Sequence, residues 1–376
     1  MTFNIENIKG REPLVDYPWR SEVDRLLTWL IGKDAHIQSF CFDLIMSASF
    51  IDATSGIEKS IEQCNSVDSY NAHLGFINLC SPCYTKKGIW RYQKAVKPQS
   101  GALGKLSSEV ILRFVEKLHP QLLEVIAVGG TESADAVLRH KSGMVMLAEV
   151  KSAPLLTYPF LFDMPESTLR GVHEKLTVTN SQLRASESAI YLHNCGVMHL
   201  GKVGSDLWPF KPLVDFVIND KNMPFIQKCI DEWLLAREAY SKKDRQNKMY
   251  YLANASGSPP KIAKERDGWP KKESISDSKT SAGMDRTDDI KKGIYQSLKI
   301  GTYIKNNKNL KTAIISNLPA YRHGEEYVNP FIEMLWGLES DYEINNNKKV
   351  ITEDNLRRVF DFIITLEEPI LRDVNL

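Results

Sequence analysis

The chain has few cysteines and no long uninterrupted apolar segment. Six cysteines in 376 residues are too few for a disulfide-rich secreted scaffold, and in a reducing compartment they are expected to be thiols or metal ligands. The most apolar early run, residues 39–51, is interrupted by Asp43 and is too short to cross a bilayer. Residues 1–10 lack the apolar core of a signal peptide. The sequence therefore predicts a cytoplasmic protein without a membrane segment.

Net charge is almost absent, since 48 Lys and Arg residues are balanced by 47 Asp and Glu residues, which leaves +1. A small net charge does not exclude a nucleic-acid partner, because basic residues can gather where phosphates lie while acids gather elsewhere. The sequence contains no Walker loop, HExxH or GxSxG motif, which disfavours a nucleotide-driven motor, a zincin protease and an α/β hydrolase. With 43% hydrophobic residues, the chain can bury a substantial core in two domains or one elaborated domain.

Residues 131–153 predict a β-hairpin that carries charged residues at matched positions. Side chains alternate between the faces of a strand, so Glu149 and Lys151 share one face. If residues 141–143 form a three-residue loop with glycine in the left-handed conformation, the pairing that follows outward from this loop sets Asp135 opposite Glu149. A loop one residue shorter or longer would turn Asp135 to the other face.

Two carboxylates and an ammonium group at one place suit a metal-dependent phosphodiesterase. Hard cations such as Mg²⁺ take oxygen ligands, so Asp135 and Glu149 could hold one together with a phosphate oxygen. Lys151 could position or deprotonate the attacking water and stabilise the transition state. The alternative is an exposed hairpin with solvated charges, since about a quarter of protein residues are charged. Apolar neighbours at 136–138 and 145–148 favour the functional interpretation, because charges in buried strands are costly unless they are paired or used.

These residues resemble the PD-(D/E)xK nuclease superfamily, whose fold is shared by most type II restriction endonucleases and by several repair and recombination nucleases. The match consists of Asp135 and, after a gap typical of the motif, Glu149-Val150-Lys151, whereas the family's preceding proline is Ala134 here. The resemblance implies an α/β fold with a restriction-endonuclease-like mixed central sheet flanked by helices. It also implies a Mg²⁺ cofactor and a homodimer acting on double-stranded DNA.

The family has a helix before the hairpin, and residues 105–118 are the candidate. Their apolar residues recur at helical spacing, and Ser107 or Ser108 would be the N-cap. Glu109 on this helix is either an additional acid of the metal site or an ordinary first-turn acid that suits the helix dipole.

The family also has a helix and a strand after the hairpin. Residues 285–301 predict a helix with Thr287 as its cap and Gly301 as its stop, and a short apolar strand opens near Leu310. One polar stripe of this helix is made of Lys292, Gln296 and Lys299. The glutamine is a candidate helper in the active site and the two lysines are candidate DNA contacts, with a solvent-exposed stripe as the alternative.

Three of the six cysteines lie around a CxxC knuckle. Zinc in structural sites takes four nitrogen or sulfur ligands, and such a set is offered by Cys64, His73, Cys80 and Cys83. Their spacing fits no established zinc pattern, so a local turn around Pro82 is favoured over a zinc site. The other three cysteines are expected to be solitary buried residues.

Aromatic and basic residues alternate just after the knuckle, in residues 84–94. Lys86, Lys87 and Arg91 could lie along a DNA backbone while Trp90 or Tyr92 packs or stacks. An amphipathic surface strand would show the same pattern.

Five parts are predicted along the chain. Residues 1–100 are a mainly helical accessory or DNA-contact region, 101–205 the first part of the catalytic core with the hairpin, 206–284 an insertion, 285–330 the second part of the core, and 331–376 a C-terminal helical region. Within the insertion, residues 242–279 carry ten basic and five acidic residues. This basic loop either reaches around DNA or is a solvated linker. The terminal helix is expected over residues 353–371.

Taken together, these patterns predict a Mg²⁺-dependent type II restriction endonuclease. Two alternatives stay open. One is a repair or recombination nuclease that recognises DNA structure, and the other is a nucleic-acid-binding protein without catalysis.

Overall fold

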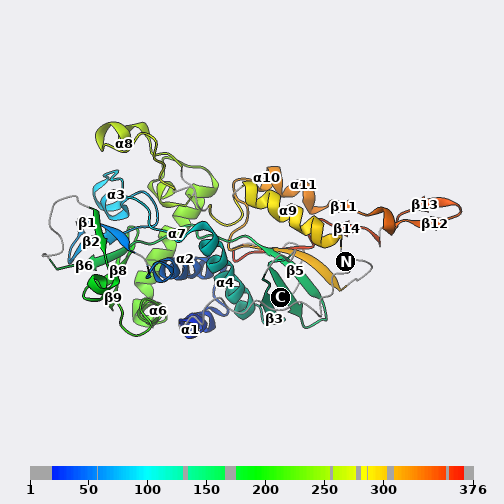
Figure 1. Cartoon of the computed structure of the whole chain (residues 1–376), viewed down its shortest axis with the longest axis horizontal. Coiled ribbons are helices and arrows are strands. Elements are labelled where there is room, and N and C mark those ends of the chain that lie inside the picture. The colour runs from blue at the N-terminus through cyan, green and yellow to red at the C-terminus, as the bar shows by residue number, and fades with distance from the viewer. Residues whose placement is uncertain are drawn as a thin grey trace. The chain divides into compact units, whose positions relative to one another are not determined.

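In a computed structural model the chain divides into two compact units (Figure 1). The hairpin unit comprises residues 1–16, 108–153 and 283–376, and the cysteine unit comprises residues 17–107 and 154–282. The structure describes residues 19–56, 58–129, 134–165, 175–254, 257–276, 281–285, 287–302, 309–352 and 355–367.

The interruption of the core is larger than the sequence analysis indicated. The first part of the hairpin unit ends at Ala153, far before the predicted residue 205, and the second part resumes at Gly283, close to the predicted residue 285. The residues between them supply four of the six strands of another sheet.

The hairpin unit contains a central sheet, short helices and a small second hairpin. Its elements are α4 (Ser100–Leu118, within which the division between the units falls), β3 (Leu122–Ala127), β4 (Ala136–His140), β5 (Val145–Val150), α9 (Thr287–Gly301), β10 (Leu310–Ile315), α10 (Gly324–Tyr327), α11 (Asn329–Ile332), β11 (Leu335–Trp336), η5 (Glu339–Asp341), β12 (Glu343–Asn345), β13 (Lys348–Val350), β14 (Arg357–Arg358) and β15 (Phe362–Ile364).

A five-stranded mixed sheet in the order β15-β10-β5-β4-β3 forms the centre of this unit. Strand β4 pairs antiparallel with both β3 and β5, whereas β10 pairs parallel with both β5 and β15. Helix α9 packs against β5 and β10. The predicted α/β class is confirmed, as are a helix before the hairpin and a helix and strand after it.

Helix α4 begins earlier than predicted. It starts at Ser100, and Leu103 and Leu106 extend its buried apolar face toward the N-terminus. Ser107 lies inside the helix, where its hydroxyl donates to the carbonyl oxygen of Gly104 at 3.3 Å. The predicted cap at residue 107 or 108 is therefore wrong, and Glu109 is a mid-helix residue, not a first-turn acid.

In the described residues 355–367, two short strands stand where a terminal helix was predicted over residues 353–371. Phe362–Ile364 pair in parallel with Ala313–Ile315 of β10, and the backbone nitrogen of Thr312 donates to the Asp361 carboxylate at 2.8 Å. Aromatic and β-branched side chains suit such a strand. The described residues 335–367 are thus mostly short strands and loops, and in β15 the distant strand β10 supplies hydrogen bonds that a helix would have formed internally.

The cysteine unit is built on an antiparallel sheet and several helices. Its elements are α1 (Arg20–Leu30), α2 (Ala35–Ala53), β1 (Lys59–Val67), β2 (Tyr70–Leu74), α3 (Ser81–Lys87), β6 (Phe160–Asp163), β7 (Lys175–Val178), α5 (Asn180–Arg184), β8 (Glu187–Leu192), β9 (Gly196–Lys202), α6 (Phe210–Val217), η3 (Asp220–Asn222), α7 (Met223–Ser241), η4 (Lys248–Leu252) and α8 (Lys261–Arg266).

Six antiparallel strands in the order β7-β1-β2-β6-β8-β9 form this sheet. The apolar run at residues 39–51 is a fully buried stretch of α2, as expected for a helix that is apolar on all sides. No helix in the described ranges is both long enough and apolar enough to span a membrane. Because β1 and β2 belong to this sheet, the predicted mainly helical character of residues 1–100 is only partly correct.

The basic segment at residues 242–279 is anchored to the cysteine unit. Trp269 and Ile275 are buried within it, and the backbone nitrogen of Asn78 donates to the carbonyl oxygen of Ile275 at 2.8 Å. In its described part, the segment is therefore packed structure and not a freely extending loop.

Candidate active site

The β4–β5 hairpin has the register that the loop chemistry predicted. Ala136 pairs with Ala148 and Arg139 pairs with Val145. Gly143 closes the loop at φ +84°, a left-handed conformation that glycine adopts without strain. Its nitrogen donates to the carbonyl oxygen of the residue at the end of β4 at 3.0 Å. The loop therefore fixes which residues face one another farther along the strands.

Asp135 directly precedes β4 and is held by two backbone contacts to β5. Its own nitrogen donates to the carbonyl oxygen of Ala148 at 2.9 Å, and the nitrogen of Val150 donates to Asp135 Oδ2 at 3.0 Å. These contacts orient the carboxylate toward the end of β5.

Lys151, the residue after β5, joins the two carboxylates. Its Nζ atom lies 2.5 Å from Glu149 Oε1 and 3.9 Å from Asp135 Oδ2. The side chain of Glu149 is only 6% exposed, whereas that of Asp135 is 47% exposed. The three predicted residues converge, with the buried acid at the bottom and the other acid facing solvent.

Burial controls the protonation of Glu149. Its pKa is raised to about 7: desolvation is the largest cause, the neighbouring Asp135 also raises the pKa, and the charge of Lys151 lowers it. A buried carboxylate beside a second carboxylate is stable as an anion only with a cation close to both. Lys151 is a cation close to both carboxylates, and it only partly offsets the effect of burial on Glu149.

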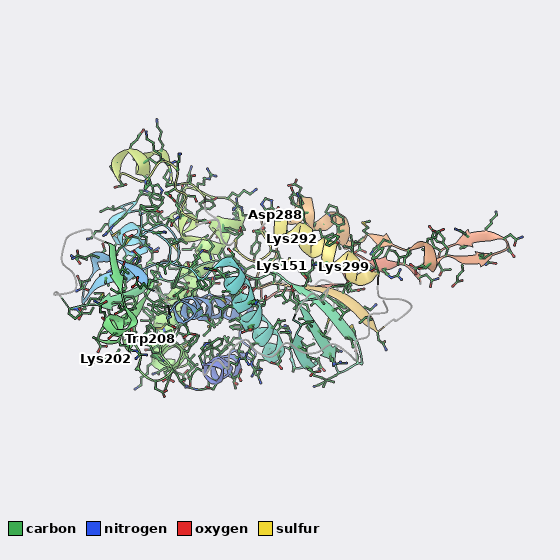
Figure 2. The ribbon with its side chains drawn as sticks, viewed as in Figure 1. Lys151, Lys202, Trp208, Asp288, Lys292 and Lys299 are labelled. Atoms are coloured by element: carbon green, nitrogen blue, oxygen red, sulfur yellow. The ribbon has the colours of Figure 1, made fainter. Side chains whose placement is uncertain are left out.

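Apolar side chains surround the stem of Lys151. It lines a small pocket with Ile290, Gly293 and Ile294 of α9 and with Ile314 of β10. Figure 2 shows Lys151 next to this helix. The aliphatic stem can lie in this pocket while the ammonium group reaches the carboxylates.

Neither a family model, a curated protein nor a solved structure matches this chain. What the site does must therefore be argued from its geometry.

Other predicted helpers lie on helices α4 and α9. On α9, Lys292 is exposed and Lys299 is half-buried (Figure 2). Gln296 is half-buried, and its Oε1 atom has no hydrogen-bond partner among the described residues. Glu109 is half-buried in the middle of α4. Their roles in catalysis and DNA contact stay predictions.

The aromatic residues near α3 pack inside the cysteine unit. Trp90 is buried, with ring centroids 4.6 Å from Tyr84 and 4.8 Å from Tyr251, and Tyr92 contacts Trp269 edge to face. Of the two predicted roles, packing is the one observed. Exposed lysines are left at the end of α3, namely Lys86 and Lys87, while Arg91 is half-buried and lies 3.9 Å from a carboxylate oxygen of Glu62.

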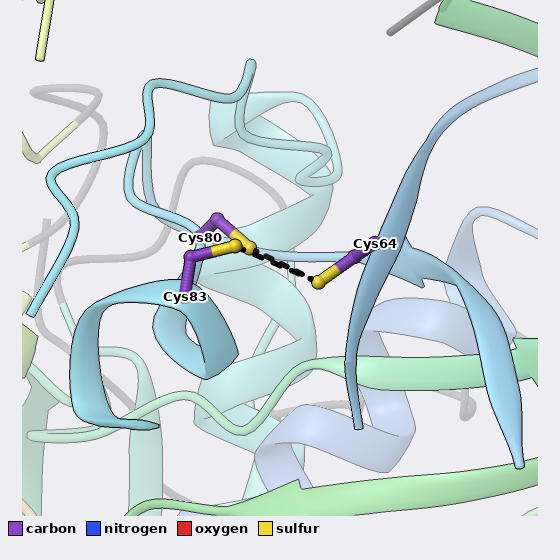
Figure 3. Close-up of side chains that lie close together, drawn as sticks. All are labelled: Cys64, Cys80 and Cys83. Atoms are coloured by element: carbon purple, nitrogen blue, oxygen red, sulfur yellow. Dashed lines mark hydrogen bonds between the residues drawn. The ribbon is translucent and has the colours of Figure 1, made fainter. Parts of the chain in front are cut away.

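The structure gathers three of the four predicted zinc ligands (Figure 3). Cys64, Cys80 and Cys83 form a buried group, and it is the one group of three or more metal-ligating side chains found among the described residues. His73 is buried and is not a member of this group, and desolvation lowers its pKa to about 4. Whether the cysteines bind a metal or only form a local turn stays a prediction.

One neighbour of this group was not predicted. Ser66 Oγ lies 3.2 Å from Cys83 Sγ. Strand alternation could have indicated it, because Ser66 is two residues after Cys64 and so shares its face.

Proposed function

We propose that this protein is a Mg²⁺-dependent endonuclease of the restriction type, which hydrolyses phosphodiester bonds in double-stranded DNA. The convergence of Asp135, Glu149 and Lys151 at the end of one hairpin carries the proposal. The order of elements in the hairpin unit supports it: a helix is followed by three antiparallel strands, a second helix and a parallel strand. This order agrees with the arrangement that the resemblance to the PD-(D/E)xK superfamily implies.

The donor set fits a hard divalent cation. Asp135 and Glu149 would hold it, since carboxylate oxygens are the ligands that Mg²⁺ prefers. Glu149 is 5% exposed, and the raised pKa of this buried acid reflects its need for a nearby positive charge. When bound, Mg²⁺ supplies charge neutralisation at the phosphate oxygens and acidifies a water ligand.

The chain's own residues orient the reactants. The backbone of Val150 fixes Asp135 through its hydrogen bond, so this carboxylate does not have to be ordered when substrate arrives. Lys151 Nζ already lies beside both carboxylates. From there it can donate to the phosphate or to the attacking water, and its charge opposes the negative charge of the transition state.

Basic residues of α9 would hold the DNA. Lys292 and Lys299 lie on α9, the helix that lines the Lys151 pocket, and lysine contacts to phosphates position a duplex without reading its sequence. A homodimer would deliver one active site to each strand of a palindromic target.

Digestion of a phage DNA of known sequence tests the proposal. With Mg²⁺ we expect discrete fragments whose ends map to one short sequence, and with a chelator no cleavage. Asp135→Ala and Lys151→Ala should abolish cleavage and retain DNA binding, while Lys141→Ala, an exposed lysine in the loop of the same hairpin, should cleave normally.

Other results would redirect or reject the proposal. Cleavage confined to branched or single-stranded DNA would identify a structure-selective nuclease. DNA binding without cleavage under any divalent metal would instead support a non-catalytic binding protein and would reject the enzyme.

A further inference from the structure

Three buried thiols meet where β1 approaches the start of α3. Cys64 comes from β1, Cys80 directly precedes α3, and Cys83 lies in its first turn. Their exposed fractions are only 2%, 2% and 5%. Cys64 Sγ is 3.6 Å from the sulfur of Cys80 and 3.7 Å from that of Cys83 (Figure 3).

These distances distinguish between the possible uses of the thiols. A disulfide requires a sulfur–sulfur distance of about 2.05 Å. Tetrahedral zinc with Zn–S bonds of about 2.3 Å requires its sulfur ligands to lie about 3.8 Å apart. The measured separations of 3.6 and 3.7 Å agree with ligands on a common ion and exclude a disulfide in this state.

The surroundings suit a negatively charged metal centre. Three thiolates and one Zn²⁺ together carry one negative charge, and Arg91 is the neighbouring cation. The carbonyl oxygen of Arg91 accepts from the nitrogen of Cys80 at 3.0 Å. The side chain of Arg91 lines the same pocket as Cys83. Its charge would therefore balance that of the centre.

A pocket adjoins the cluster on one side. Cys83 is the cysteine that lines it, together with Ser66, Lys87, Arg91 and Asp267. Zinc sites with three protein ligands keep a fourth position for water or another exchangeable ligand. Since His73 does not belong to the group of three, this pocket is where a fourth ligand can enter.

We propose that Cys64, Cys80 and Cys83 bind one Zn²⁺ through their thiolates, with the fourth position open to the pocket beside Ser66. The ion ties β1 to α3 and so stabilises the cysteine unit. The site is separate from the carboxylates of the proposed nuclease, and its existence does not depend on that activity.

Metal analysis of the full chain tests this site. The parent protein carries Asp135→Ala, so that metal held by the carboxylates is not counted, and is purified under reducing conditions. We expect one zinc per chain, and after replacement by Co²⁺ we expect thiolate charge-transfer absorption and the intense visible bands of a tetrahedral site. Cys64→Ser and Cys83→Ser should bind Co²⁺ at least tenfold more weakly, whereas Cys195→Ser, a half-buried cysteine outside the cluster, should match the parent.

If a cysteine variant misfolds, the visible spectrum of the Co²⁺-substituted parent protein still tests the site. Imidazole should shift the visible bands by entering the fourth position, and an unchanged spectrum would contradict a position open to the pocket. Six freely titratable thiols without bound metal, or a disulfide between Cys64 and Cys80 found by mass spectrometry of the protein as purified, would overturn the site.

Discussion

The backbone nitrogen of Val150 donates a hydrogen bond to Asp135 Oδ2 at 3.0 Å. This contact continues the hairpin pairing by one step beyond Ala136 and Ala148. The same register that pairs the strands thus also places the solvent-facing acid beside Glu149 and Lys151. Stability and the proposed catalysis can be separated here, because one depends on the oxygen acceptor of Asp135 and the other on its charge.

Asp135→Asn should separate the contribution of Asp135 to stability from its contribution to cleavage. Asparagine keeps an acceptor for Val150 but carries no charge, so we expect single-turnover cleavage to fall by about 10²-fold or more with little change in the free energy of unfolding. Asp135→Ala should lose cleavage and also about 1 kcal/mol of stability, the usual contribution of one hydrogen bond. Urea unfolding and a plasmid cleavage assay measure the two effects. Normal cleavage by Asp135→Asn would argue against a role for this charge.

Changes in the hairpin loop should affect stability and cleavage differently. A Cβ atom at Gly143 would meet no atom within 4 Å, so Gly143→Ala costs only backbone strain at φ +84°, about 1 kcal/mol, and cleavage persists. Deleting Ser142 shifts the register by one residue and turns Asp135 to the other face, so cleavage is lost. Retained cleavage in the deletion variant would show that this register is not needed.

The hairpin was predictable because its information is local. A glycine at the left-handed loop position and the alternation of strand side chains together determine which residues face one another. Helix α9 was predictable for a similar reason. The threonine and the glycine that served as its start and stop signals, Thr287 and Gly301, are its first and last residues.

Features that depend on distant partners were predicted poorly. The apolar spacing around Phe362 also suits a helix, and only the edge of β10 makes the segment a strand. The sequence did not predict that Cys64 lies beside the knuckle, because this depends on the position of β1, which spacing along the chain does not express. His73 lies between the cysteines in sequence, yet it belongs to β2 and is not a member of the group of three.

The raised pKa of Glu149 predicts how stability depends on pH. Burial raises this pKa from 4.5 to about 7, so the folded metal-free protein holds the proton more tightly than the unfolded chain does. Its free energy of unfolding should therefore fall as pH rises from about 4.5 to about 7, by at most roughly 3 kcal/mol. Glu149→Gln has no proton to lose and should show a shallower slope. Urea unfolding in a chelator at several pH values measures both slopes, and equal slopes would contradict the assignment.

Addition of Mg²⁺ should remove most of the fall in the free energy of unfolding between about pH 4.5 and 7, because metal binding favours the deprotonated carboxylate of Glu149. The stabilisation by Mg²⁺ should accordingly be larger at pH 8 than at pH 5 in the wild type. In Glu149→Gln it should be small at both pH values. A stabilisation by Mg²⁺ that is equally large in the two proteins would place the metal elsewhere.

Asp43 should be the most sensitive polar residue of the cysteine unit. Its buried carboxylate accepts from the backbone nitrogens of Leu155 and Leu156 at 3.1 and 2.8 Å and from Trp233 Nε1 at 2.7 Å. Asp43→Ala leaves three buried donors without this acceptor, and at about 1–3 kcal/mol for each donor we expect a loss of roughly 3–9 kcal/mol.

Ser47 is the matched control one turn along α2. Its hydroxyl oxygen accepts a single hydrogen bond, from the nitrogen of Tyr158 at 2.9 Å, so Ser47→Ala should cost about 1 kcal/mol. Asp43→Asn should fall between the two, because an amide oxygen can still accept from part of the set. Thermal and urea unfolding give the ranking. If Asp43→Ala were no more destabilising than Ser47→Ala, the buried carboxylate would not be what fixes the chain after Pro154 against α2.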